Sequence, residues 1–132
     1  MEKLITAFAT DDGKSFIDRH FGDADFYDIY EISSQTAKLL KRIDNTTEED
    51  DDEEGHGDPV KAQGVTGMLK KEGVNMAVSR VFGPNLKRIK KKFLCILVEK
   101  TSIEESLKIL QKRFPSLLDE WNVGEERTFI RL

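Results

Sequence analysis

The alternation of apolar and polar positions along the chain predicts five strands and three helices. Three β-like runs come first, and two more lie between segments in which apolar residues recur every three or four positions. The last helix should end near Phe114-Pro115, because proline cannot continue a helical pattern. The predicted strands cover residues 3–9, 26–32, 36–43, 74–78 and 93–98, and the predicted helices begin near residues 59, 83 and 102.

This order of elements predicts an α/β fold. Three strands with a hairpin between the second and third, followed by strands that alternate with helices, form a mixed sheet flanked by helices. Right-handed crossovers should make the first, fourth and fifth strands parallel neighbours. Ligands of such sheets gather beyond the carboxyl ends of the parallel strands. Here those ends lead into residues 10–13, 80–85 and 99–102.

The length of 132 residues predicts one domain with a C-terminal extension. We place the domain at residues 1–115, including an acidic loop at 46–58, and the extension at 116–132. Apolar residues of the extension could enlarge the core, pair as an added strand or anchor a dimer. These residues are Trp121, Val123, Phe129 and Ile130.

The net charge of −4 combines two very different parts of the chain. Residues 48–54 supply seven of the 25 acidic groups, and the other 18 acidic residues are outnumbered by 21 basic ones, a net of +3. The acidic run partly resembles a calcium loop, but Lys61 stands where the bidentate glutamate should be. We therefore expect a self-repelling, solvated insertion in a mildly basic domain.

Composition and motifs exclude several classes of protein. No apolar run approaches the roughly 20 residues of a membrane span, and the first residues lack the features of a signal peptide, so we expect a cytoplasmic protein. The single cysteine, Cys95, rules out an internal disulfide, and its apolar run predicts a core residue. No nucleophile–base pair can be placed, so we do not expect an enzyme.

Two histidines are candidate metal ligands. His20 and His56 each lie beside glycine in a predicted loop, where an imidazole can reach a metal and small neighbours leave room for it. Two histidines alone do not make a closed metal site, and a loop histidine can equally cap a turn or face water. Both interpretations stay open at this point.

The turn after the fourth strand is a candidate anion site. Free amides and the helix dipole favour an anion where a helix begins, and a thiometallate cluster is an anion. Alternatively, glycine and proline here only shape a tight strand-to-helix turn. The candidate residues at this turn and at the end of the neighbouring first strand are Thr10, Asp11, Arg80, Gly83, Pro84 and Asn85.

A cluster of basic residues follows this turn. Phosphate or an acidic protein could dock there, although helices often show water a lysine-rich face. No RNA-reading aromatic signature accompanies the cluster, so nucleic acid is not the expected partner. The cluster comprises Lys87, Arg88, Lys90, Lys91 and Lys92, with Lys70 and Lys71 on the preceding predicted helix.

Five segments in this order and spacing resemble the dinitrogenase iron-molybdenum cofactor-binding family over roughly residues 3–113. The resemblance implies a ribonuclease-H-like fold with a five-stranded mixed sheet. In nitrogenase accessory members it implies binding or carriage of iron-molybdenum cofactor or its precursors; other members stand alone, and one branch holds a molybdenum–copper sulfide cluster. The acidic loop, where relatives are often glycine-rich, and the C-terminal extension depart from the family. The segments are Thr10 to Gly13, His20-Phe21-Gly22, 26–32, Gly55-His56-Gly57 and Gly83-Pro84-Asn85.

The expected function is therefore non-catalytic binding or carriage of an anionic metal–sulfur cluster containing molybdenum, iron or copper, with cluster donor or acceptor proteins as partners. One alternative is a protein-interaction or regulatory module of the same fold without a cluster. A divalent-metal nuclease is a weaker alternative that rests on fold analogy. For a nuclease, Asp11 and Asp12 would have no acidic partner on the fourth strand.

Overall fold

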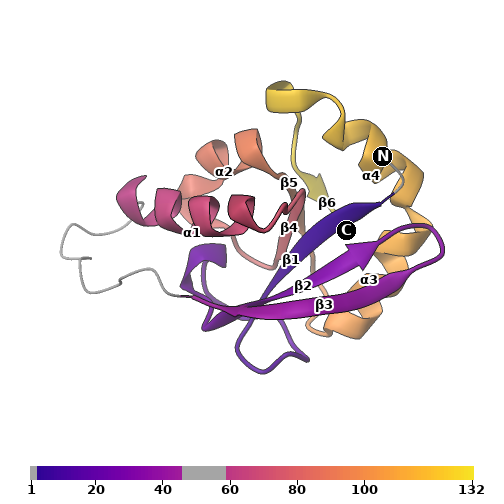
Figure 1. Ribbon diagram of the computed structural model, residues 1–132, viewed down its shortest axis with the longest axis horizontal. Helices are drawn as coiled ribbons and strands as arrows, with labels where there is room; N and C mark the ends of the chain where they lie inside the picture. Colours follow the sequence, from indigo (N-terminus) through magenta and orange to yellow (C-terminus); the bar gives the residue numbers. More distant parts are fainter. Residues whose placement is uncertain (1–2, 46–58) are drawn as a thin grey trace.

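The computed structural model of the protein describes residues 3–45 and 59–132, the side chains of 59–63 and 85 excepted. Its centre is one six-stranded sheet with the strand order β3-β2-β1-β4-β5-β6 (Figure 1). Within the described ranges, no helix is long and apolar enough to cross a membrane. The strands are β1 (Leu4–Thr10), β2 (Phe26–Ile32), β3 (Ala37–Asp44), β4 (Met76–Ser79), β5 (Leu94–Leu97) and β6 (Ile130–Arg131).

The sheet is mixed, and its topology confirms the predicted ribonuclease-H-like fold class. β2 pairs antiparallel with both β1 and β3, whereas β1, β4 and β5 are parallel neighbours. Ala77 of β4 lies between Ala7 of β1 and Cys95 of β5 in this register. The prediction of five strands is one short, because the C-terminal extension adds β6 parallel to β5.

Helices cover both faces of the sheet (Figure 1). β1 alternates its side chains between two buried faces, which explains its almost uninterrupted apolar sequence. One core lies against α1 (Pro59–Lys71) and α2 (Leu86–Lys92), and the other against α3 (Ile103–Lys112) and α4 (Phe114–Trp121). Fully buried side chains of the first core include Phe21, Tyr27, Leu69 and Phe93, and those of the second include Leu4, Phe8, Met76 and Leu94.

The second pair of helices shows how local sequence sets helix ends. The hydroxyl of Ser102 accepts a hydrogen bond from the N–H of Glu105 at 3.3 Å, which caps the start of α3. α3 ends at Lys112, close to the predicted position. A further helix, α4, then begins at Phe114, because Pro115 stands in its first turn, where proline is tolerated.

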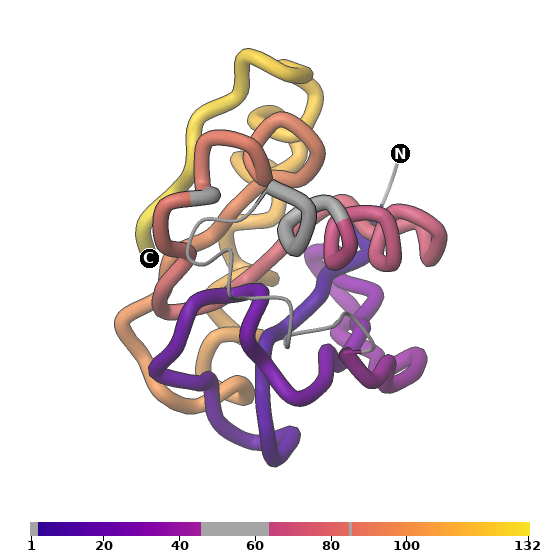
Figure 2. Tube along the Cα trace, turned by 90° about the vertical axis from the view of Figure 1, so that its left-hand side faces the viewer, coloured from indigo at the N-terminus to yellow at the C-terminus, as the bar shows by residue number. Residues whose placement is uncertain are grey.

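The C-terminal extension is held against α2 by one buried arginine. Arg127 is 4% exposed and donates hydrogen bonds to the carbonyls of Lys90 and Lys91 at 3.2 and 3.1 Å and to that of Trp121 at 3.1 Å. Two of these carbonyls end α2, where helix carbonyls lack internal partners and the dipole favours a cation. Burial lowers the pKa of the guanidinium below its usual range. Figure 2 shows the C-terminal segment, in yellow, running beside α2.

We predict that Arg127→Ala lowers the free energy of unfolding by about 2–3 kcal/mol, because hydrogen bonds from a charged group to buried carbonyls are lost. Urea denaturation monitored by circular dichroism measures the change. Arg131→Ala, which removes an exposed arginine from the same segment, is the matched control and should cost less than about 0.5 kcal/mol. Equal effects of the two substitutions would show that Arg127 does not hold the extension.

Candidate functional site

The carboxyl ends of β1, β4 and β5 meet at one edge of the sheet, where the sequence predicted ligand binding. The loop after β1, residues 11–25, crosses this edge. In this loop His20 forms a β-bridge with Val81, just beyond β4, and Ser15 forms one with Ser102, between β5 and α3. These bridges connect the loop to the segments that follow β4 and β5, at the edge where a ligand was expected.

Buried side chains fill the space under this loop. Phe16, Ile17 and Phe21 are 6%, 4% and 0% exposed. The ring of Phe21 stacks on that of Phe82, with 5.2 Å between the centroids. In the described part of the chain, side chains of the loop itself therefore fill much of the space beyond the strand ends, where the sequence predicted a ligand.

A hollow of about 410 Å³ remains on the α3 side of this edge. Burial raises the pKa of Tyr30 in its wall, and the charge of Asp28 adds to the effect. The lining residues are Gly13, Lys14, Tyr30, Ser102, Ile103, Glu104 and Leu107; Gly13 and Ser102 come from the predicted strand-end segments, but none is among the individual candidate ligands.

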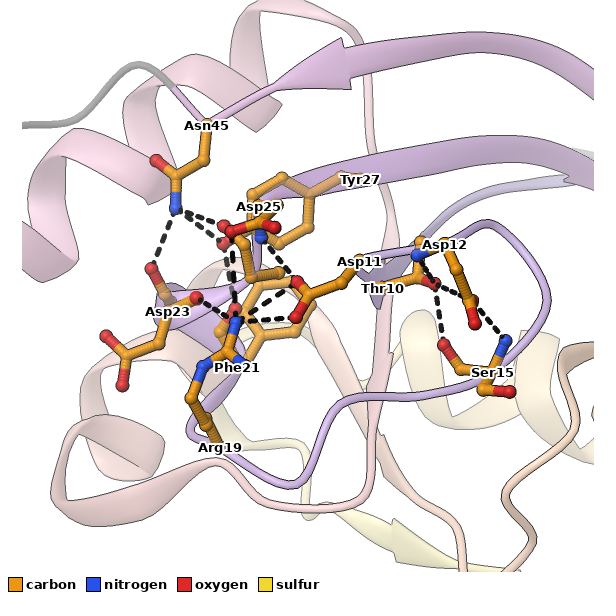
Figure 3. A network of polar contacts seen from close by, with 12 residues as sticks. Thr10, Asp11, Asp12, Ser15, Arg19, Phe21, Asp23, Asp25, Tyr27 and Asn45 are labelled. Atoms are coloured by element: carbon orange, nitrogen blue, oxygen red, sulfur yellow. Dashed lines mark hydrogen bonds and ion pairs between the residues drawn. The ribbon is translucent and has the colours of Figure 1, made fainter.

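Thr10 and Asp12 build the turn that ends β1 (Figure 3). The buried hydroxyl of Thr10 donates to the carbonyl of Ser15 at 2.6 Å and accepts from the N–H of Gly13 at 2.9 Å. The carboxylate of Asp12 accepts from the N–H groups of Lys14 and Ser15, both at 2.8 Å, and these bonds lower its pKa. The hydroxyl of Thr10 is therefore already engaged within the turn, and it could bind a ligand, as predicted, only by giving up one of these hydrogen bonds.

Asp11 is also engaged within the loop. Its carboxylate accepts from the N–H of Asp25 at 2.8 Å and pairs with the guanidinium of Arg19 at 2.9 Å (Figure 3). The same guanidinium donates to the carbonyl of Asp23 at 3.0 Å. Asp11 and Asp12 thus both stabilise the loop, which is not the arrangement that a nuclease metal site would need.

The segment that carries His20 is fixed from the hairpin. It continues into a 3₁₀ turn, η1 (Phe21–Asp23), and the phenol of Tyr27 donates to the carbonyl of Phe21 at 2.7 Å. Asn45, at the end of β3, donates through its amide to the carbonyls of Gly22 and Ala24, both at 2.9 Å. Sequence reasoning missed Asn45, and its one local signal is an amide side chain directly after a strand.

His20 and Gly83, predicted separately, lie together. His20 is exposed, and Gly83 has φ +77°, a conformation that favours glycine. A Cβ on Gly83 would lie 2.6 Å from Cγ and Nδ1 of His20 and 2.7 Å from Cε1. Gly83 therefore both forms the turn and lets the imidazole approach the backbone.

The turn before α2 offers fewer hydrogen-bond donors to an anion than the sequence predicted. Pro84 has no N–H, and the N–H of Leu86 already bonds the carbonyl of Gly83 in the 3₁₀ turn η3 (Gly83–Asn85). Arg80 forms an ion pair with Asp18, which is 82% exposed. The side chain of Asn85 and the whole of His56 lie outside the described residues.

The described residues do not form a closed metal site. They contain no group of three or more histidine, cysteine, aspartate or glutamate side chains that could hold a metal ion. Cys95 is fully buried, as predicted, and burial raises the pKa of its thiol to about 12. A cluster that brings its own sulfide ligands would need fewer protein ligands than a bare ion, and His20 is the predicted metal ligand that lies among the described residues.

We predict that Gly83→Ala rotates the imidazole of His20, because the new Cβ would overlap the ring. Gly73→Ala is the matched control, since Gly73 has φ +78° and no atom within 4 Å of an added Cβ. Both substitutions should cost about 1–2 kcal/mol of stability for the left-handed backbone. Only Gly83→Ala should shift the ring resonances of His20 in NMR spectra, and unchanged resonances would contradict the observed packing.

We also predict that Cys95 reacts very slowly with a disulfide reagent in the native protein at pH 8. Raising the thiol pKa from 9.0 to about 12 lowers the thiolate fraction about a thousandfold, and burial limits access further. The reaction is followed by absorbance, with the protein in denaturant as control. A native rate close to the denatured one would show that Cys95 is accessible after all.

Comparisons with known proteins assign the chain to a family. A crystal structure from Methanocaldococcus jannaschii, of a protein named a "putative dinitrogenase", is similar with a TM-score of 0.58, covering 85% of this chain and 91% of that chain at 20% sequence identity. At that identity the likeness shows the fold. No curated protein sequence matches significantly. The sequence model of the dinitrogenase iron-molybdenum cofactor family matches residues 2–113, so the chain belongs to this family.

Proposed function

We propose that this protein binds or carries an anionic metal–sulfur cluster, such as iron-molybdenum cofactor or its precursor, without catalysing a reaction. Family membership over residues 2–113 supports a role connected with this cofactor. The observation that carries the proposal is the exposed imidazole of His20, held over Gly83 at the carboxyl edge of the parallel strands. Partners would be proteins that donate or accept the cluster.

His20 is suited to hold a cluster by a single bond. The Cγ–Nδ1–Cε1 edge of its ring lies against Gly83, so Nε2 is the nitrogen farther from the backbone. Neutral imidazole is a good ligand for iron and copper. Because η1 is anchored by Tyr27 and Asn45, the neighbouring imidazole has little backbone freedom to lose on binding.

Arg80 can supply positive charge at this place. Its partner Asp18 is 82% exposed, and an exposed ion pair contributes only about 0.2–1 kcal/mol. An anionic cluster could therefore replace Asp18 at small cost. We infer that electrostatic attraction here depends on this side chain more than on the backbone N–H groups of η3.

A second candidate is a protein-interaction module of the same fold. It is supported by Phe16, Ile17 and Phe21, which fill the edge where an open pocket was expected. A module of this kind would retain no cluster under the conditions of the experiment below. The same measurement therefore separates the two functions.

We predict that the purified protein, incubated without oxygen with iron-molybdenum cofactor or with tetrathiomolybdate and copper(I), retains metal and visible absorption through gel filtration. His20→Ala should lower the retained metal about tenfold or more, because a ligand is lost. His56→Ala is measured beside it, and Arg131→Ala serves as a surface control that should bind like wild type. Equal retention by wild type and by the His20→Ala/His56→Ala protein would exclude histidine ligation, and no retention by wild type would exclude the proposal.

A further inference from the structure

Four of the five cations of α2 lie on one exposed side of the helix, and Lys90 is half-buried. Ile89 is 5% exposed and packs into the core, with Leu86 partly buried beside it. Lys87 and Lys91 stand four residues apart and are exposed, as are Arg88 and Lys92. At 100° per residue Lys87 and Lys91 lie on the face turned away from Ile89, and Arg88 and Lys92 lie on the flank between that face and Ile89.

This arrangement opposes the stability of the helix. Like charges four residues apart destabilise a helix, and cations in the first turn oppose its dipole. Lys90, Lys91 and Lys92 in the last turn of α2 suit the dipole, but its first turn has no acidic residue and carries Lys87 and Arg88. A helix of seven residues has little stability of its own with which to tolerate these effects.

α3 shows that the chain does not arrange charge this way everywhere. Glu104 and Glu105 occupy its first turn and Lys112 its last, as the dipole favours. Lys108 follows Glu104 by four residues, which is a stabilising spacing. Helix stability therefore explains the charges of α3, but not the first-turn cations and the like-charged pairs of α2.

The ammonium groups of α2 have no carboxylate partner in the described part of the chain. The ion pairs found among the described residues involve other cations, namely Lys3, Arg19, Lys41, Arg42 and Arg80. The 3₁₀ turn η4 (Gly124–Glu126) packs beside α2 and brings acidic residues near it, but none within ion-pair distance of Lys87, Lys91 or Lys92.

We propose that this cationic face of α2 docks an acidic segment of a partner polypeptide. Lys87 and Lys91 are about 6 Å apart along the helix axis. Alternate side chains of an extended chain are about 6.8 Å apart, so acidic residues at every second position match this spacing. The proposal uses other residues than the His20 site and does not require cluster binding.

Nucleic acid fits this face less well. Binding of single strands combines a cationic groove with aromatic side chains on which bases stack. α2 has no aromatic residue, and the exposed large hydrophobic side chains of the described chain are Leu39, Leu40 and Val123. Charge without a stacking surface favours carboxylates as the counterpart.

The test is fluorescence anisotropy with a dye-labelled synthetic peptide in which glutamate alternates with serine. The full-length protein should bind it, and more weakly as salt is raised. Lys87→Gln/Lys91→Gln should weaken binding about tenfold, because two charge contacts are lost. Lys108→Gln/Lys112→Gln, a matched exposed pair on α3, should bind like wild type. His20→Ala should also bind like wild type, which separates this proposal from cluster binding.

Two further measurements show whether weaker binding results from lost charge or from lost stability. The thermal midpoint of Lys87→Gln/Lys91→Gln should equal or exceed that of wild type, because a repulsion is removed. Lys87→Arg/Lys91→Arg keeps both charges and should restore binding. Absence of binding by wild type, equal weakening by the two glutamine pairs, or tighter binding of a single-stranded oligonucleotide of equal charge would each overturn the proposal.

Discussion

The loop after β1 crosses the ends of two other strands. Its backbone N–H and carbonyl groups therefore need hydrogen-bond partners within the protein. The loop crosses above buried aromatic rings, where an unpaired N–H or carbonyl would be costly. The hydrogen bonds of Thr10, Asp11, Asp12, Tyr27 and Asn45 meet this requirement. The position of His20 follows from them, since its imidazole lies on Gly83 only while the loop is held in this path.

Much of the fold could be predicted from the sequence, because it depends on local patterns. The nearly continuous apolar run of β1 marks a buried strand, the run around Cys95 marks a strand covered on both faces, and the crossover rule then orders them. β6 was not assigned, because Ile130 and Arg131 carry no pattern of their own and gain their structure from β5. α4 was not predicted, because a proline that ends one helix can also stand in the first turn of the next.

The candidate site was less predictable, because it depends on contacts between distant residues. Sequence placed Thr10 and Asp11 at the carboxyl edge of the parallel strands but could not show that Arg19 and Asp25 already bind the Asp11 carboxylate. His20 and Gly83 were both chosen, for unrelated reasons, and their contact appears only in three dimensions. Three features of the structure meet at α2. The Gly83 turn precedes this helix, its exposed side carries cations, and its last carbonyls accept hydrogen bonds from Arg127.

The bond between Arg127 and α2 also bears on where this protein can be divided. The match to the family ends at residue 113, yet the group that completes α2 comes from beyond it. A graft of the matched part alone into another host would leave two helix carbonyls to water and strip β5 of its outer neighbour.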